Sequence, residues 1–318
     1  SLPDQGSVLI GAKGVMLLAA LSALCAPWLV PAWLAPVRLF VGLLAWLALT
    51  KLVELARDRP RDPRMRTSRV AFLLWLSMPP VTSWPADAAQ AGQFREQGMR
   101  RALRGLLKMI ALLALVGLSM AWPSLHQQYA LHSLWGLCIC YVVFSGAMDL
   151  GTCLPMLCGV HVAEIFDRPY LATSPRELWG KRWNLWFHGF VQREVFLPLR
   201  RSPQLALLAT FVLSGVAHEY LVIAALGQTH AEMFTFFVLQ GAFVWLTWRV
   251  ERDVRRRWPA PVGWALNLSF LILTAPLFLD PVLEAVPLHR LREVCTTPFS
   301  RALPWVCSAA SDHRSPWR

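Results

Sequence analysis

Charged residues are scarce in this chain. Of its 318 residues, 16% are Asp, Glu, Lys or Arg, whereas 56% are hydrophobic. A soluble domain usually carries about 25% charged residues, and the mean hydropathy of +0.43 is correspondingly high. This shortage of charge excludes an ordinary soluble domain and predicts an integral membrane protein.

Acidic residues are the scarcer of the two charge types. The chain has 19 Asp and Glu against 31 Lys and Arg, and its formal net charge is +12. In a soluble protein such an excess would suggest nucleic-acid binding. Here most Lys and Arg lie in connections between apolar runs, where the positive-inside bias of membrane proteins places them. We therefore predict contact with membrane lipid and no nucleic-acid partner.

Seven apolar runs have about the length that crosses a membrane, which is ~20 residues for a helix. We expect an all-α polytopic membrane protein with about seven transmembrane helices plus interfacial or re-entrant helices. The stretch Arg69–Met78 is too short to cross and is stopped by Pro79 and Pro80, which predicts one of these smaller helices. The predicted spans are 14–34, 37–56, 103–122, 131–151, 205–226, 233–250 and 262–283.

Lys and Arg are missing from the connections 35–36, 123–130 and 227–232, and they are concentrated in 57–104, 152–202 and 249–257. This alternation predicts that the N-terminus and the basic connections are cytoplasmic. We expect the membrane to be the cytoplasmic membrane of a bacterium. The tail after Leu283 would then be exterior although it contains several arginines. Either a long tail escapes the rule, or the apolar patch Leu303–Val306 re-enters the membrane.

Several other features are missing. The first span lacks a strongly basic start and an A-x-A-like cleavage site, so it is not expected to be a signal peptide. No repeat of 20–50 residues and no low-complexity linker is present, which predicts one domain over 1–318 with its chemistry concentrated in about 164–222.

The cysteines do not complete a metal motif. Cys153, Cys158 and His161 have a C-x4-C-x2-H spacing, but no fourth ligand of suitable spacing follows. Structural zinc sites are normally four-coordinate, so we predict no metal. Cys295 and Cys307 lie in the tail, and they could pair only if that tail is exterior.

His218 stands inside the apolar span 205–226. An ionisable group at membrane depth costs several kcal/mol when unpaired, so its default interpretation is functional. Ser214 and Gly215 precede it and leave room for a neighbouring helix or a ligand. Glu219 points about 100° away on a helix, which predicts a structural contact with an arginine or a backbone group. The alternatives for His218 are a hydrogen bond to a neighbouring helix and haem ligation. Asp149 lies deep in another span, and we expect it to pair with an arginine.

A basic, aromatic segment precedes this span at 179–188. Asn184 and His188 are four residues apart, so on a helix they would share a face, with Trp179 and Trp183 beside them. Aromatic residues of this kind also gather at membrane interfaces, where the segment could act as an anchor helix. Together with His218, the segment favours a single binding site.

Several motifs in this part of the chain resemble those of a known protein family. The run from Phe166 to Asn184 and the run Ser214-Gly-Val-Ala-His218-Glu219 resemble motifs of plant-type wax ester synthases in the membrane-bound O-acyltransferase superfamily. The W-N-x-x-x-H pattern ending at His188 and the H-E-Y-L-V run from His218 are also similar to the diacylglycerol and sterol acyltransferase branch. The F-Y-x-D-W-W-N motif of that branch is missing, which favours the wax synthase branch.

The resemblance implies acyl transfer from acyl-CoA to a lipophilic alcohol, most simply a long-chain fatty alcohol, in a central tunnel of the membrane domain. His218 would be the general base and Asn184 would stabilise or orient the oxyanion. Acyl-CoA would be a co-substrate, and no cofactor is expected. Seven further residues would bind substrate, and the three cations among them would hold the CoA phosphates. These residues are His188, Trp179, Lys181, Arg182, Trp183, Arg193 and Ser214.

Two alternatives stay open at this point. One keeps the reaction but changes the acceptor to a sterol or a hydroxylated secondary metabolite. The other is a different class, a transporter or a haem-binding membrane subunit that uses His218 and His188. Transporters usually show internal repeats or correspondingly broken helices, and this sequence shows neither.

Overall fold

The computed structural model describes residues 5–57, 64, 68–77, 82–229, 231–254 and 258–286, and Cys295 and Cys307 lie outside them. Seven long helices dominate the described residues. They are α1 (Gln5–Cys25), α2 (Ala35–Ala56), α5 (Ala88–Ala121), α6 (Tyr129–Leu157), α9 (Pro203–Leu226), α10 (Glu232–Val254) and α11 (Ala260–Ala285).

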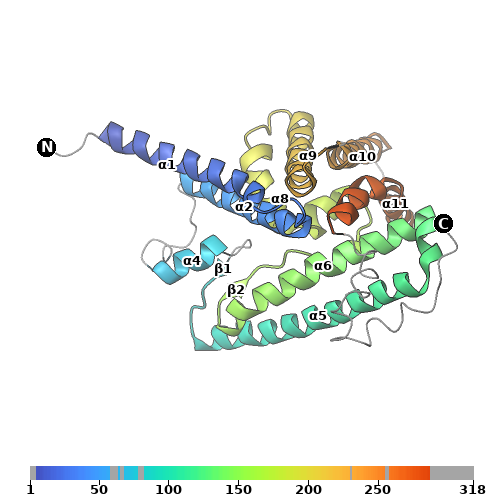
Figure 1. Cartoon of the computed structure of the whole chain (residues 1–318), viewed down its shortest axis with the longest axis horizontal. Coiled ribbons are helices and arrows are strands. Elements are labelled where there is room, and N and C mark those ends of the chain that lie inside the picture. The colour runs from blue at the N-terminus through green and yellow to red at the C-terminus, as the bar shows by residue number, and fades with distance from the viewer. Residues whose placement is uncertain are drawn as a thin grey trace.

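The helices do not pack in chain order. Each contacts the next along the series α1, α2, α9, α10, α11, α6 and α5. The long antiparallel pair α5 and α6 forms one layer, with α9, α10 and α11 packed above it and α1 and α2 at the side (Figure 1). As a result, α9 lies between α2 and α10, two helices far from each other in sequence.

Short elements fill the connections. The strands β1 (Thr82–Ser83) and β2 (His161–Val162) pair antiparallel, with Thr82 opposite Val162. The largest group of short elements lies between α6 and α9, where the chain changes direction several times. The short helices are η1 (Ala26–Leu29), α4 (Arg69–Ser77), η2 (Pro123–Gln127), η3 (Pro169–Leu171), α7 (Pro175–Glu177), the π-helical turns η4 (Leu178–Arg182) and η5 (Gln192–Phe196), and α8 (Leu185–Val191).

Local sequence accounts for the helix ends. Asp87 caps α5 by accepting a hydrogen bond from the Gln90 N–H at 2.8 Å. Pro203 occupies the first turn of α9, where its missing N–H costs nothing. Gly227 ends the same helix in the left-handed conformation with φ of 75°. The span that carries His218 is therefore bounded by residues suited to those positions.

The predicted spans correspond to these seven helices, and α4 occupies the predicted short helix at 69–78. Among the described residues, six helices are long and apolar enough to cross a membrane, and the apolar part of the first, Gly14–Leu29, is shorter. The first span was predicted to run to residue 34, but α1 ends at Cys25 because Pro27 and Pro31 follow it. The span predicted at 103–122 begins at Ala88, since the charged first half of α5 is helical as well but is not apolar.

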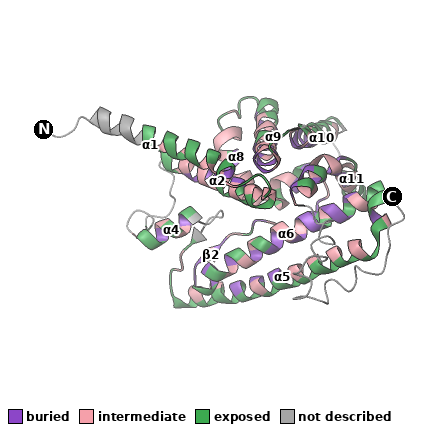
Figure 2. Cartoon of the chain, viewed as in Figure 1, coloured by how far each residue is buried: buried purple, intermediate pink, exposed green. Residues whose placement is uncertain are grey.

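The outer faces of the helices are apolar. Along α5, the side chains of Leu103, Leu106, Leu107, Ile110 and Leu113 are all exposed. Figure 2 shows the exposed residues of this helix along its outer side. A soluble monomer rarely exposes so continuous an apolar surface, whereas a lipid bilayer would cover it. The architecture is that of an all-α, multi-pass integral membrane protein.

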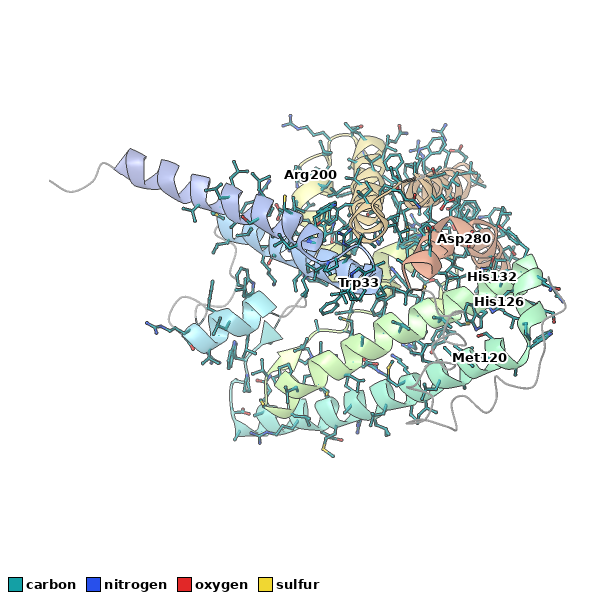
Figure 3. The ribbon with its side chains drawn as sticks, in the orientation of Figure 1. Trp33, Met120, His126, His132, Arg200 and Asp280 are labelled. Carbon is teal, nitrogen blue, oxygen red and sulfur yellow. The ribbon has the colours of Figure 1, made fainter. Side chains whose placement is uncertain are left out.

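Polar side chains join α6 to α11 at one end of the bundle. His126 and His132 lie close together there, and Asp280 of α11 faces His132 (Figure 3). The Nε2 atom of His132 is 3.8 Å from Oδ1 of Asp280, and the His132 ring stacks on Trp135. This contact closes the interface between helices that are over 100 residues apart in sequence.

The start of α11 holds the chain just before α7. Trp264 Nε1 donates to the Tyr170 carbonyl at 2.8 Å, and Asn267 Nδ2 donates to the Ala172 carbonyl at 3.5 Å. Gly263 lies against the backbone carbonyl of Thr173, where a Cβ atom would collide with that oxygen. A backbone oxygen cannot rotate away as a side chain can, so this position requires glycine.

We predict that Gly263→Ala lowers the thermal unfolding midpoint of the purified protein, because the added methyl group forces the 170–173 segment away from α11. Overpacking of this kind costs about 1–3 kcal/mol. Gly117→Ala is the control: a Cβ at this exposed helical position meets nothing within 4 Å, so the midpoint should stay or rise slightly. Equal midpoints for the two variants would contradict the proposed close approach.

Candidate active site

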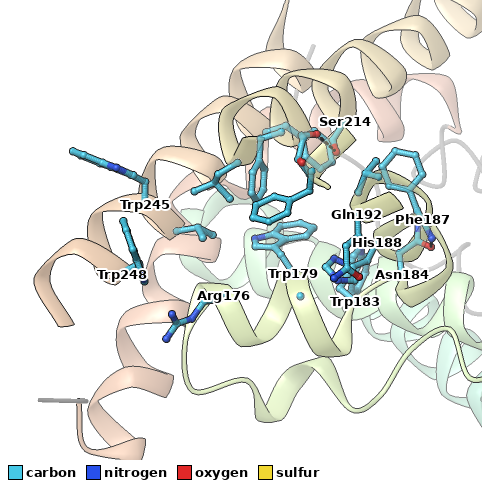
Figure 4. Close-up of a pocket in the computed structure, with 18 of the residues that line it drawn as sticks. Arg176, Trp179, Trp183, Asn184, Phe187, His188, Gln192, Ser214, Trp245 and Trp248 are labelled. Atoms are coloured by element: carbon cyan, nitrogen blue, oxygen red, sulfur yellow. Dashed lines mark hydrogen bonds between the residues drawn. The ribbon is translucent and has the colours of Figure 1, made fainter. Parts of the chain in front are cut away.

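A cavity of about 410 Å³ lies between α9, α10 and the short helices of 175–196. Its size is within the usual range of small-molecule sites, ~300–1,000 Å³. In Figure 4, Trp179 lies in the middle of the view, with Trp245 and Trp248 of α10 on one side and Trp183, Asn184 and His188 on the other. The walls are mainly aromatic and aliphatic, and a small number of polar groups face the interior.

His218 of α9 is one of these polar groups. Its Nδ1 atom is 2.7 Å from the Ser214 carbonyl oxygen, one helical turn earlier. A carbonyl oxygen only accepts hydrogen bonds, so Nδ1 must carry the proton. In the neutral imidazole, Nε2 is then left with its lone pair. The helix therefore fixes the tautomer in which Nε2 can accept a proton.

Packing on both sides of α9 holds this ring. The His218 ring lies against Phe237 of α10, with 4.2 Å between ring centroids. From the opposite side, Trp46 of α2 donates from Nε1 to the Ala217 carbonyl at 3.1 Å. Tyr220 donates its hydroxyl hydrogen to the Leu24 carbonyl at 2.7 Å. Helices on either side thus restrict the rotation and sliding of α9 at the level of His218.

Glu219 has a structural role, as predicted. Its carboxylate accepts hydrogen bonds from the backbone N–H groups of Ala231 at 3.2 Å and Phe234 at 3.1 Å, and from the Thr229 hydroxyl. These groups lie at the start of α10, where helix N–H groups have no partner within the helix. Glu219 therefore caps α10 and does not line the cavity.

Asn184 occupies a sharp turn at the cavity wall. Its φ of 45° and ψ of 58° are left-handed, a conformation that asparagine tolerates better than most residues. Its side-chain oxygen caps α8 by accepting from the Phe187 N–H at 3.3 Å. The side-chain amide nitrogen carries two N–H donors, and among the described residues no hydrogen bond uses them.

The expectation that Asn184 and His188 share one helix face was wrong. The π-helical turn η4 ends at Arg182, Trp183 is extended, and α8 begins only at Leu185. Asn184 therefore precedes the helix as its cap. Both side chains nevertheless line the same cavity.

Trp179 is fixed by a buried chain of hydrogen bonds. Its Nε1 donates to Oε1 of Gln240 at 3.2 Å, and Gln240 Nε2 donates to the Thr274 hydroxyl at 2.9 Å. Gln240 and Thr274 are 1% and 4% exposed. Unpaired polar groups at such depth would cost about 1–3 kcal/mol each, so this chain sets the orientation of the indole and links the cavity to α10 and α11.

His188 also lines the cavity, opposite α9. Burial lowers the pKa of its imidazole below the ordinary value of 6.5, because an apolar environment disfavours the charged form. At neutral pH the ring is therefore uncharged. It can exchange a hydrogen bond with a bound molecule without bringing a charge into the cavity.

The three predicted phosphate-binding cations do not line the cavity. Arg182 binds Glu177 at 2.7 Å and donates to the Asp167 carbonyl at 3.2 Å. Arg193 binds Glu54 of α2 at 2.6 Å. Both arginines hold the short helices in place. Lys181 is exposed beside the turn at Trp183.

The structure adds residues that the sequence did not single out. Arg176 lies at the edge of the cavity, 3.1 Å from Glu251 of α10, and about half of its side chain is exposed. The cavity face of α9 is a helical stripe with intervals of three or four residues. Counting back from His218 in steps of three or four residues could have identified these residues from the sequence. They are Leu207, Thr210, Phe211, Ser214 and His218. The sequence did not indicate which residues of α10 face the cavity, since that span is apolar on several sides.

Comparison with known proteins shows a family match and several similar proteins. A family model described as "Membrane bound O-acyl transferase family" matches residues 162–239, which include most of the cavity. A "Probable long-chain-alcohol O-fatty-acyltransferase 7" of Arabidopsis thaliana is 32% identical over 161 residues, covering 46% of this chain and 47% of the relative.

Two further Arabidopsis thaliana proteins are similar. "Probable long-chain-alcohol O-fatty-acyltransferase 2" is 32% identical, with coverage of 45% of this chain and 44% of the relative. "Acyl-CoA--sterol O-acyltransferase 1" is 32% identical, with 35% of each chain covered. The chain thus spans less than half the length of these curated relatives.

Proposed function

Because the chain belongs to the membrane-bound O-acyl transferase family through the segment that lines the cavity, we propose that it transfers an acyl group from acyl-CoA to the hydroxyl of a lipophilic alcohol. The observation that carries the proposal is the hydrogen bond of His218 Nδ1 to the Ser214 carbonyl, which leaves Nε2 free to act as a base inside an apolar cavity.

The chemistry follows from that tautomer. A hydroxyl group is a weak nucleophile until a base removes its proton, and histidine is the usual base near neutral pH. Nε2 of His218 takes the alcohol proton while the alcohol oxygen attacks the thioester carbonyl carbon. When the tetrahedral intermediate collapses, the C–S bond breaks and the imidazolium returns the proton to the CoA sulfur. The products are an ester and free CoA, with no enzyme nucleophile consumed.

Asn184 has the complementary role. Negative charge develops on the carbonyl oxygen during the attack, and a fixed donor in an apolar site stabilises it with little reorganisation. The side-chain oxygen of Asn184 is held by the α8 cap, which leaves its N–H groups as donors. His188, Trp179, Trp183 and Ser214 line the same cavity and orient the two substrates.

We take a long-chain fatty alcohol as the primary acceptor, which makes the product a wax ester. The names of two of the matched relatives support this class, and the aromatic walls suit a flexible chain. A sterol is the second candidate acceptor, favoured by the relative named as a sterol acyltransferase. Both alcohols would present a hydroxyl to the same Nε2 atom.

CoA enters from the cytoplasmic side in this proposal. The basic connections 57–104 and 152–202 face the cytoplasm under the positive-inside rule, as does the N-terminus. Arg176 at the cavity edge and the exposed Lys181 are then the cations available to the CoA phosphates. Arg182 and Arg193 contribute indirectly through the ion pairs that fix the short helices.

We predict that His218→Ala reduces ester formation from acyl-CoA and a long-chain alcohol about 10²–10⁴-fold, the usual contribution of a general base. The variant should keep the wild-type elution profile and thermal midpoint within a few degrees. His132→Asn, which replaces an imidazole outside the cavity lining, is the control and should retain turnover. A His218→Ala variant with more than about a third of wild-type activity would exclude the base assignment.

We predict that Asn184→Asp lowers kcat strongly while leaving the KM for acyl-CoA within a few-fold. The aspartate keeps the α8 cap and tolerates the left-handed turn, but it replaces the N–H donors with a negative oxygen. A loss confined to the transition state appears in kcat. Asn184→Gly, which keeps the backbone conformation and removes the side chain, should also lose kcat. Steady-state kinetics that show only a raised KM in both variants would rule out this role.

A further inference from the structure

Five charged side chains meet beside α5 and α6. Arg104 binds both oxygens of Asp149, at 2.9 and 2.6 Å, and Lys108 Nζ is 2.6 Å from the same carboxylate. This confirms the expected pairing of Asp149 with an arginine. Arg101 donates to the Thr152 hydroxyl at 3.1 Å. The carboxylate of Asp149 is buried, and charges at this depth are tolerated only when they are well paired.

The fifth member of the cluster, Glu164, belongs to neither helix. Its two oxygens accept from Arg104 Nη2 at 2.9 and 3.0 Å, and Arg101 Nη2 is 3.3 Å from Oε1. The side chains of Arg104 and Glu164 are each 44% exposed, and an isolated pair of that exposure contributes little. Here the buried Asp149 already fixes the guanidinium, so binding Glu164 requires little further ordering of Arg104.

The 161–168 segment that carries Glu164 is bonded to the turn at the cavity wall. Leu185 N–H donates to the Ile165 carbonyl at 2.9 Å, and Asp167 N–H donates to the Arg182 carbonyl at 2.9 Å. Between these two bonds, the Phe166 ring meets the Trp183 ring edge-on, with centroids 5.0 Å apart. The contacts therefore flank Trp183 and Asn184 on both sides.

This turn needs such support because its backbone is not helical. Trp183 is extended, with φ of −107° and ψ of 126°, and Asn184 is left-handed. A break between two short helical turns has few bonds of its own to define its position. The 161–168 segment supplies them, and that segment is in turn held to the α5–α6 layer by Glu164.

We propose that Glu164 is a positioning residue, which holds the Trp183–Asn184 turn at the cavity wall through its ion pairs with Arg101 and Arg104. This role rests on the acyl transfer proposed above. A displacement of about 1 Å at a reacting centre can cost roughly 100-fold in rate. Charges on α5 thereby affect the reaction without contacting a substrate.

The first test measures whether Glu164 holds the 161–168 segment and the Trp183–Asn184 turn in place, and it requires no enzymatic activity. In Glu164→Ala, hydrogen exchange measured by mass spectrometry should become about tenfold faster in peptides that contain Asp167 and Leu185, because the opening of a local segment sets these rates. Glu96→Ala is the control, because it also removes a glutamate that pairs with an arginine of α5. Its pair with Arg100, at 2.6 Å, is mostly exposed and does not involve the 161–168 segment, so exchange should not change. Unchanged exchange in Glu164→Ala would overturn the proposal.

The second test measures catalysis. Glu164→Ala should lower kcat about tenfold, in line with a small displacement of the turn, with the KM for acyl-CoA within about threefold and Glu96→Ala unchanged. Glu164→Gln keeps an oxygen that can accept from Arg104 and should recover kcat to within about threefold of wild type. Faster exchange with an unchanged kcat, or no recovery in Glu164→Gln, would overturn the positioning role.

Should Glu164→Ala not fold, Glu164→Asp replaces it, since this variant keeps the charge and withdraws the carboxylate by one methylene. It should shift exchange and kcat in the same directions by smaller factors, and a variant identical to wild type in both would overturn the proposal. If the wild-type protein made no ester from any alcohol, the proposed function would fail, while the exchange measurements would still decide whether Glu164 holds the turn.

Discussion

The hydrogen bond between His218 and the Ser214 carbonyl is the constraint around which the site is arranged. A histidine within a membrane helix must satisfy its polar atoms locally or face a penalty of several kcal/mol. Here the bond satisfies Nδ1 within the helix at 2.7 Å. Because the partner can only accept, the same bond selects the tautomer in which Nε2 keeps its lone pair. One local interaction thus offsets the cost of burial and, in the proposed reaction, prepares His218 to act as the base.

The surrounding elements preserve this arrangement. Phe237 of α10 packs on the His218 ring, and Trp46 of α2 donates to the backbone at Ala217. On the other wall, hydrogen bonds join the residues on either side of the Trp183–Asn184 turn to the 161–168 segment. The two proposed catalytic residues, His218 and Asn184, come from two parts of the chain, and each part contacts elements that are distant from it in sequence.

Much of the fold could be predicted from the sequence, because apolar runs of about 20 residues have few alternatives to spanning helices. Two helix ends were predicted wrongly, and each error has an identifiable cause. Pro27 and Pro31 end the first helix early, and the charged first half of α5 forms a helix that hydropathy does not detect. The pairing of Asp149 and the backbone contacts of Glu219 followed from the high cost of unpaired charge in an apolar environment.

The sequence predicted which residues form the site better than it predicted their geometry. Six of the nine predicted site residues line the cavity. The remaining three, Lys181, Arg182 and Arg193, do not. Arg182 binds the nearby Glu177, whereas the carboxylate that binds Arg193 is brought close only by the tertiary structure. Glu54, the partner of Arg193, is 139 positions away. The left-handed turn at Asn184 was equally hidden, since its W-N-x-x-x-H spacing is also compatible with one continuous helix.

The most direct test of the proposed function is to supply the purified protein with a long-chain acyl-CoA and a panel of alcohols, and to identify the products by mass spectrometry. The panel should contain primary fatty alcohols of several lengths and a sterol, with water as the competing acceptor. We expect an intact ester of at least one alcohol, formed in equal amount to the CoA released. Release of CoA with free fatty acid as the sole product, or no turnover with any acceptor, would contradict acyl transfer to an alcohol.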